Sequence, residues 1–322
     1  MVAFTPKGIR SQARDRLRSN GANAHQLVLI HTGAVVLLSL ISSGLHIYLD
    51  EQIGSTGGLN GLGTRSILQT LQAMLQYATT LFSPFWTAGF LTVAMIWAAD
   101  QQPRQKDLLY GFRRFGSVVS YELMLGLMTF FLMMGTGYAA GMVFTFTPYA
   151  NKLVSLLEPF ISTGTLDLSL VPMDQLMDAY FPFLVMWLVV MIPVLTVFLY
   201  SLRLGIYFLL DHPGMSALRA MATSAAAMRG RKMQMFKLDL SFWWYYLLEF
   251  LLVIVCYLDM ILPVLGVQLP FNATVAYFVF LALYGILQLG LHLWKKPELE
   301  TSYALAYHFV THPDHMDPPT MN

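Results

Sequence analysis

Six apolar stretches in the 322-residue sequence are each long enough to cross a lipid bilayer as an α-helix. A crossing helix needs about 20 mostly apolar residues, because each residue adds about 1.5 Å and the hydrocarbon core is about 30 Å thick. The stretches cover approximately residues 26–49, 77–99, 117–146, 180–210, 240–265 and 271–294. The strands of a membrane barrel would alternate apolar and polar residues over about 10 positions, and these stretches do not. We therefore expect an all-α, polytopic membrane protein with six transmembrane helices.

The composition and charge of the chain exclude other classes of protein. Hydrophobic residues make up 56% of the chain and charged residues 11%, whereas soluble domains carry about 25% charged residues. A soluble domain and a disordered chain are therefore excluded. A net charge of +1 leaves no bulk positive charge for a nucleic acid. The one cysteine, Cys256, excludes an intrachain disulfide and a cysteine-based zinc site, and we assign no metal and no cofactor.

The distribution of basic residues predicts the orientation and the limits of the membrane domain. With six spans, 17 of the 19 lysines and arginines fall on one side, and only Arg65 and Lys152 fall on the other. Basic residues in short loops stay in the cytoplasm, so both termini are predicted to be cytoplasmic. We expect a basic cytoplasmic N-terminal helix over residues 1–25, a six-span transmembrane domain over 26–296, and a polar cytoplasmic tail over 297–322.

Segments between the predicted spans carry apolar stripes that suit short interfacial helices. One stripe lies within residues 67–75 on the outer side and another within 108–115 on the inner side, and Ser216 suits the N-cap of a further inner helix. These helices either anchor loops at the interface or dock a cytoplasmic partner. The candidate contacts for lipid head groups or for such a partner are Arg113, Arg114, Arg229, Arg231 and Lys232. The expected partners are the lipid bilayer and either a second copy of the chain or a cytoplasmic or membrane protein.

Several ordered motifs resemble a bacterial integral-membrane family known as domain of unknown function 975. The residues from Met228 to Phe242 run Met-Arg-Gly-Arg-Lys-Met-Gln-Met-Phe-Lys-Leu-Asp-Leu-Ser-Phe, and Pro-Phe-Asn-Ala-Thr follows from Pro270. This is similar to the family's Met-x-Gly-His-Lys-Trp…Phe-x-Leu-x-Leu-Ser-Phe and Pro-Tyr-x-x-Ala-Thr. Arg231 and Met233 stand where the family has His and Trp.

Other segments extend this resemblance over most of the chain. The Ser-Pro of residues 83–84 with Gly89, and then residues 107–116, are similar to the family's second conserved region. The basic segment from Ile9 to Asn20 is similar to its N-terminal helix. The resemblance implies a multi-span protein of the bacterial cytoplasmic membrane, and it implies no established activity.

Four charged residues form a candidate polar site inside the membrane. Ionisable residues in spans usually face the bundle interior or a water-filled cavity. Glu249 lies about 13 Å into the fifth span, Glu122 lies near the start of the third, and Asp259 lies near the outer end of the fifth. Glu249 can bind a proton or cation, pair with Arg203, or hold helices together as a neutral, hydrogen-bonded group. Arg203 either contacts an anion or marks the cytoplasmic end of the fourth span.

No established catalytic motif is found in the sequence. Zinc-protease, nucleophile-elbow, P-loop and dinucleotide-binding signatures are missing, so we predict no enzyme activity and no catalytic residue. His308, His312 and His315 suit a metal site less well than a polar tail, because Pro313 interrupts their spacing. Pro182, Pro193 and Pro263 lie in predicted spans, where proline either serves packing alone or opens a helix beside a substrate site.

Three functions are compatible with these features. The first is a permease-like unit that moves a small molecule, lipid or peptide across the cytoplasmic membrane. The second is a non-transporting scaffold or accessory subunit for envelope or export machinery. The third, a lipid-modifying enzyme, needs a catalytic constellation that the sequence does not supply. A polar cavity that reaches Glu249 would favour transport, whereas a tightly packed bundle would exclude simple transport.

Overall fold

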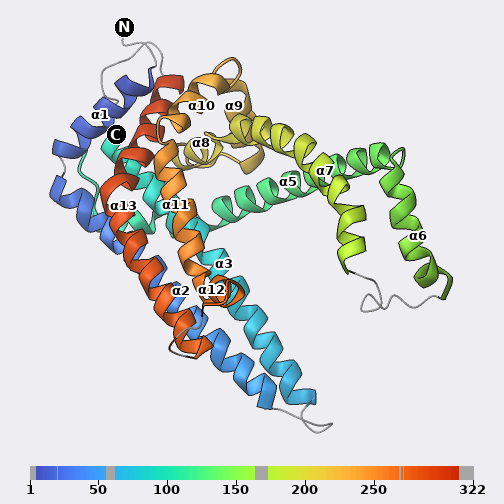
Figure 1. Cartoon of the computed structure of the whole chain (residues 1–322). Helices are drawn as coiled ribbons and strands as arrows, with labels where there is room; N and C mark the ends of the chain where they lie inside the picture. Colours follow the sequence, from blue (N-terminus) through green and yellow to red (C-terminus); the bar gives the residue numbers. More distant parts are fainter. Residues whose placement is uncertain are drawn as a thin grey trace.

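The computed structural model describes residues 5–19, 21–55, 62–163, 173–267, 270 and 272–311. Throughout these ranges the regular structure is helical and contains no strand (Figure 1). Five helices are long and apolar enough to cross a membrane, and a sixth span results if one pair of helices bent by 63° is taken together. The all-α, polytopic fold predicted from the sequence is therefore confirmed.

The helices are numbered in chain order, with one 3₁₀-helix, η2. They are α1 (Pro6–Ser19), α2 (Gly21–Ser55), α3 (Leu62–Ala98), η2 (Gln105–Leu109), α4 (Tyr110–Arg113), α5 (Phe115–Phe144), α6 (Pro148–Thr163), α7 (Met173–Leu202), α8 (Gly205–Asp211), α9 (Ala217–Ala227), α10 (Lys232–Leu240), α11 (Trp243–Cys256), α12 (Leu258–Val264) and α13 (Ala273–Thr311). The bent pair is α10 and α11. Helices α7 and α8 together provide one candidate span.

The long helices form two limbs that diverge from a common junction (Figure 1). In the first limb α2, α3, α11, α12 and α13 pack side by side, and in the second α5 and α7 pack together with α6 at the far end. The short helices α1, η2, α4, α8, α9 and α10 gather where the limbs meet. Because most of the basic side chains belong to these short helices and to the adjoining part of α13, we name this region the basic end.

The hydrophobic core is concentrated at the basic end. Trp97, Phe90, Phe242 and Tyr307 are among the largest fully buried side chains, and they come from α3, α13 and the break between α10 and α11. In contrast, the most apolar stretch of α7 contains no buried residue. The second limb therefore exposes its apolar side chains, as a helix in contact with lipid does.

Two glycines allow α3 to touch the η2–α4 segment backbone to backbone. A Cβ added to Gly89 would lie 1.8 Å from the carbonyl oxygen of Leu108, and one added to Gly111 would lie 2.0 Å from that of Phe85. No side chain fits at either position. Both glycines belong to the segments that resemble the family's second conserved region, and this contact gives that region a structural role.

A second pair of glycines lies where the two long helices of the second limb meet. The Gly137 position faces Trp187, 3.6 Å from its Nε1 atom, and the Gly141 position faces Phe183 at 3.9 Å. The Trp187 Nε1–H also donates a hydrogen bond of 3.3 Å to Thr136 Oγ1. This glycine pair therefore serves close packing of α5 against α7, as small residues do in membranes.

Several predicted boundaries differ from those in the structure. Residues 67–75 are continuous with the second span in α3 and do not form a separate interfacial helix. Helix α13 does not end at the predicted boundary of 296 but continues to Thr311, and residues such as Ser302 and Ala306 are fully buried. The N-cap prediction is confirmed, because Ser216 Oγ accepts a hydrogen bond from the Arg219 amide. His312, His315 and the rest of the chain's end lie outside the described residues.

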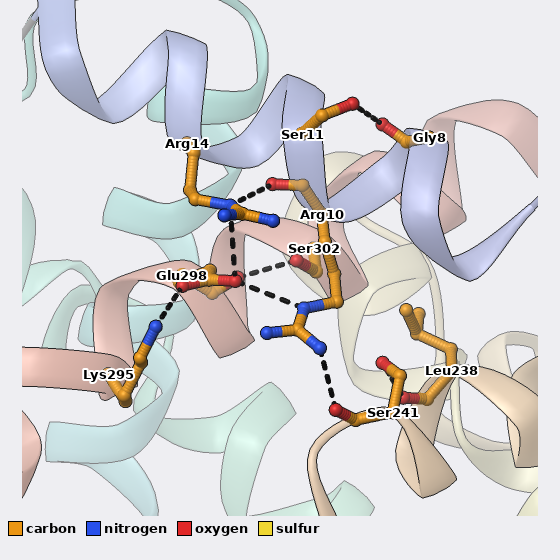
Figure 2. A network of polar contacts seen from close by, with 9 residues as sticks. All are labelled: Gly8, Arg10, Ser11, Arg14, Leu238, Ser241, Lys295, Glu298 and Ser302. Atoms are coloured by element: carbon orange, nitrogen blue, oxygen red, sulfur yellow. Dashed lines mark hydrogen bonds and ion pairs between the residues drawn. The ribbon is translucent and has the colours of Figure 1, made fainter.

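The extension of α13 is held by α1 through a network centred on one buried carboxylate (Figure 2). Glu298 is 5% exposed, and its Oε1 lies 3.1 Å from Arg10 Nε and 3.5 Å from Arg14 Nε. Its other oxygen accepts a 2.8 Å bond from Lys295. Arg10 also donates a 2.6 Å bond to the carbonyl of Ser241, at the end of α10. One arginine thereby joins α1, α10 and α13.

Candidate functional site

A polar cavity of about 340 Å³ lies at the basic end, and we name it the inner cavity. Its lining combines apolar residues, tyrosines and four charged side chains from α3, the α7–α8 region, α11 and α13. The residues are Leu91, Arg203, Ile206, Tyr207, Tyr245, Tyr246, Glu249, Lys296, Leu299, Glu300 and Tyr303. The volume lies within the range of about 300–1,000 Å³ that is typical of small-molecule sites.

Glu249 is the point at which this cavity connects with the interior of the first limb. Its Oε1 accepts a 2.5 Å hydrogen bond from the Tyr245 hydroxyl and lies 2.9 Å from His292 Nε2. The other ring nitrogen of His292 lies 3.1 Å from Thr32 Oγ1. The Glu249 side chain is 39% exposed whereas that of His292 is 6% exposed. A hydrogen-bonded chain therefore runs from a carboxylate on the cavity wall to the buried contact between α13 and α2.

Arg203 occupies the same wall but pairs with a different acid. Its Nη2 lies 3.5 Å from Asp239 Oδ1, and its guanidinium lies over the Tyr303 ring at 4.5 Å. The Asp239 carboxylate also accepts hydrogen bonds from the hydroxyls of Tyr200 and Tyr303. The predicted pairing of Arg203 with Glu249 is therefore not observed, although both side chains line one cavity. Arg203 follows the last residue of α7 and lies within the candidate span that α7 and α8 form together, so its place at the cytoplasmic end of the fourth span stays a prediction.

Two more charged side chains, one cationic and one anionic, line the inner cavity. Lys296 interacts electrostatically with Glu249 and Glu300, and Glu300 lies close to Tyr207, which also lines the cavity. With Arg203, the wall thus carries two cationic and two anionic side chains. This balance favours a polar solute without net charge over a strongly anionic or cationic one.

Two helix breaks border the cavity, and polar side chains satisfy the backbone groups that the breaks expose. Between α7 and α8, Ser224 Oγ donates to the Ser201 carbonyl at 2.9 Å and accepts from the Leu204 amide at 3.2 Å. The other break, between α10 and α11, is the one that Arg10 stabilises. Neither break contains a proline, since Pro182 and Pro193 lie within α7 and Pro263 within α12. Broken helices beside a polar site are typical of membrane transporters.

A second cavity, of about 700 Å³, lies in the same limb toward the end opposite the basic end, and we name it the outer cavity. It lies between α2, α3, α13 and the break between α11 and α12. The residues that line it are Val35, Leu38, Ser39, Ser42, Ser43, His46, Ile47, Gln76, Thr79, Phe82, Ser83, Tyr257 and Tyr277. None of these residues is aspartate, glutamate, lysine or arginine.

The remaining candidate acids, Glu122 and Asp259, are not among the residues that line either cavity. Glu122 is an exposed residue of α5 in the second limb. Asp259 lies in the first turn of α12, where the helix dipole favours a negative charge. Neither residue lines the inner or the outer cavity. The structure therefore brings two of the four predicted polar residues, Glu249 and Arg203, to one site.

The basic residues predicted to contact lipid or a partner fall into two groups. Arg113 and Arg114 lie at the end of α4, where Arg113 is exposed and the Arg114 guanidinium lies 5.8 Å from the Tyr110 ring. Arg229 is exposed between α9 and α10. Arg231 instead donates a 2.8 Å hydrogen bond to the Val310 carbonyl, so it has a structural role where the family pattern has histidine. Lys232 is half-buried at the start of α10.

Sequence reasoning missed several residues of the inner cavity. Tyr245 and Tyr246 belong to an aromatic cluster that is also typical of a membrane interface. His292 lies in an apolar span, and Lys296 and Glu300 fall just beyond the predicted end of that span. The signal available in the sequence is helical spacing, since His292, Lys296 and Glu300 follow one another at four-residue intervals and so share one face.

The fold and the inner cavity define a polytopic α-helical membrane protein with a charged site inside one limb. A family model described as "Protein of unknown function (DUF975)" matches residues 1–311. The chain therefore belongs to this family, as its sequence motifs predict. No curated protein and no solved structure matches it significantly.

Proposed function

We propose that this protein is a permease-like unit that moves a small polar molecule across the bacterial cytoplasmic membrane, with the inner cavity as its solute-binding site. The observation that carries the proposal is that the inner cavity reaches Glu249. An ionisable residue is costly in a membrane unless it serves a polar pathway or pairs with another group. Glu249 has both an exposed edge on the cavity and buried partners in the bundle. In this proposal the basic end faces the cytoplasm, following the excess of basic residues there.

The geometry suits a coupling of solute movement to protons. The Glu249 carboxylate and the His292 ring can hold a proton at the boundary between the cavity and the buried contact with Thr32. A carboxylate that gains a proton loses its attraction for nearby cations such as Lys296. Protonation at Glu249 would thereby change the contacts between α11 and α13, which line the cavity.

The direct test is uptake by purified protein in liposomes. Proteoliposomes and protein-free liposomes are given a defined mixture of small water-soluble metabolites, with an inward proton gradient imposed. We expect at least one small polar metabolite to accumulate only in the proteoliposomes, as measured by mass spectrometry of the washed vesicles. Identical contents in both kinds of vesicle would overturn the proposal.

A second candidate function is favoured by the exposed second limb. The most apolar part of α7 buries no residue, so this limb is available to lipid, to a second copy or to another membrane protein. A non-transporting scaffold would use such a surface together with the exposed Arg113 and Arg229 at the basic end. Purification in mild detergent distinguishes the two functions. A stoichiometric ATPase partner favours transport, whereas an envelope enzyme or export protein favours a scaffold.

A further inference from the structure

We infer that the outer cavity is a second binding site, and that it takes an uncharged, hydrogen-bonding solute of the sugar or polyol class. This inference rests on the proposed function, because it names the class of the transported solute and assigns the outer cavity to the pathway of that solute.

The described residues that line the outer cavity are rich in hydroxyl groups and include no aspartate, glutamate, lysine or arginine. Ser39, Ser42, Ser43 and Thr79 supply hydroxyl groups to the lining. Those of Ser39 and Thr79 donate to carbonyls of their own helices and so offer a solute an acceptor, and Tyr277 donates a 3.0 Å bond to Ser43. Among the side chains of this wall that the structure describes, a charged solute would find no acidic residue, lysine or arginine to compensate its desolvation. A solute with several hydroxyl groups meets matching donors and acceptors instead.

One polar atom in the lining has an unused hydrogen-bonding capacity. The Nε2 atom of His46 is buried and has no hydrogen-bond partner, although buried polar atoms are almost always satisfied. His46 lines the outer cavity. A hydroxyl group of a bound solute would supply the missing partner.

The two cavities follow one another along the same helices. On α3, Ser83 lines the outer cavity and Leu91 lines the inner one, which corresponds to about 12 Å along a helix. In the same way, Tyr257 at the end of α11 lines the outer cavity, and Glu249 earlier in α11 lines the inner one. A solute that binds in both cavities meets balanced charges in the inner cavity and hydroxyl groups in the outer one. A solute without net charge suits both.

A compact group of ring side chains packs between α2 and α3. The His31 ring lies over Phe90 at 4.5 Å and beside Trp86 at 5.9 Å, and the Trp86 Nε1–H donates a 2.9 Å hydrogen bond to the His31 carbonyl. His31 is 3% exposed. Along α3, Trp86 and Phe90 lie between Ser83, which lines the outer cavity, and Leu91, which lines the inner cavity.

Cysteine labelling tests the inference. Cys256 is the only cysteine, so a Cys256→Ser background permits single cysteines at Ser42 or, as a second position, at Ser39. The protein is studied in lipid nanodiscs without sugar-based detergents, which would compete for the site. Iodoacetamide is used because it is uncharged and reacts with ionised thiols in water. Leu45→Cys, on the lipid-exposed face of the same helix, is the matched control.

We expect labelling of Ser42→Cys about 100-fold faster than that of Leu45→Cys, because a thiolate is disfavoured in lipid.

Glucose, maltose and glycerol are then compared with gluconate and glucosamine. At least one uncharged solute should slow labelling about tenfold when present at ten times its dissociation constant, while the charged analogues should not. Slow labelling at both Ser42 and Ser39, no protection by any uncharged solute, or equal protection by the charged analogues would overturn the inference. Protection without uptake would refute the proposed transport alone, and uptake without protection would refute this site alone.

Discussion

Glu249 Oε1 lies 2.9 Å from Nε2 of His292, so a single carboxylate oxygen links α11 to α13 at the wall of the inner cavity. The same oxygen accepts the Tyr245 hydroxyl. The sequence left open whether Glu249 serves a proton or cation site or holds helices together. The structure shows the helix link directly, and the exposed edge of the carboxylate on the cavity is the basis of the proposed site.

The strength of this link is measurable by a double-mutant cycle. We expect Glu249→Ala and His292→Ala to be coupled by about 1 kcal/mol, since measured hydrogen bonds between membrane helices average about 0.6 kcal/mol and reach about 1.7. The free energy of unfolding in mixed detergent is the readout. A matched cycle between Glu249→Ala and Glu122→Ala should be additive, because Glu122 lies in the other limb. Additivity in the first cycle would show that the contact contributes nothing to stability.

Replacing Gly89 tests the backbone contact between α3 and η2. We expect Gly89→Ala to destabilise the protein by about 3 kcal/mol or more, because the new Cβ would overlap the Leu108 carbonyl and overpacking costs about 1–3 kcal/mol even in adaptable cores. Gly126→Ala is the control, since nothing lies within 4 Å of its Cβ position and alanine suits a helix better than glycine. The melting temperature of each variant is the readout. Equal melting temperatures for the two variants would refute the close contact.

The network around Glu298 predicts that α1 detaches when Arg10 is removed. Breaking a buried ion pair costs about 3–5 kcal/mol, and we expect about 1–3 kcal/mol for Arg10→Gln because Arg14 and Lys295 still flank Glu298. Trypsin should then cleave after Arg14 or Arg16 several times faster than in the unmodified protein. Lys7→Gln removes an exposed charge from the same helix and should leave the cleavage rate unchanged. Equal rates for both variants would mean that the network does not hold α1.

The proposed orientation predicts the side of the membrane on which the chain ends. With six spans and the basic end in the cytoplasm, green fluorescent protein fused after Asn322 should fluoresce, and alkaline phosphatase fused at the same point should be inactive. Fusions in the α2–α3 connection should show the opposite pattern. Active phosphatase at the C-terminal fusion would reverse the orientation.

The fold class and span positions could be predicted because they depend on local properties. Apolar runs of about 20 residues determine helices in lipid whatever their neighbours are. The continuation of α13 to Thr311 could not be predicted, because Lys295, Lys296 and Glu298 indicate solvent in isolation. In the structure they are compensated by partners distant in the sequence, among them Arg10 and Glu249.

The candidate site could be predicted only in part for the same reason. Glu249 stands out because it is an acid within an apolar run, and no long-range information is needed to find it. Its partner His292 comes from another helix, 43 residues away. Asp239, which pairs with Arg203, could not be recognised as a site residue in the sequence either, because it lies in a polar segment. The two diverging limbs also depend on tertiary contacts at the basic end that no local pattern contains.

The central claim is that the inner cavity with Glu249 is the transport site. The most direct measurement is the initial rate of proton-driven uptake by proteoliposomes for three proteins: the unmodified chain, Glu249→Gln and Glu122→Gln. Both variants lose one acidic group from an apolar helix, but only Glu249 lines the cavity. We predict that Glu249→Gln abolishes uptake while remaining folded, and that Glu122→Gln retains it. An unchanged rate in folded Glu249→Gln would contradict this account.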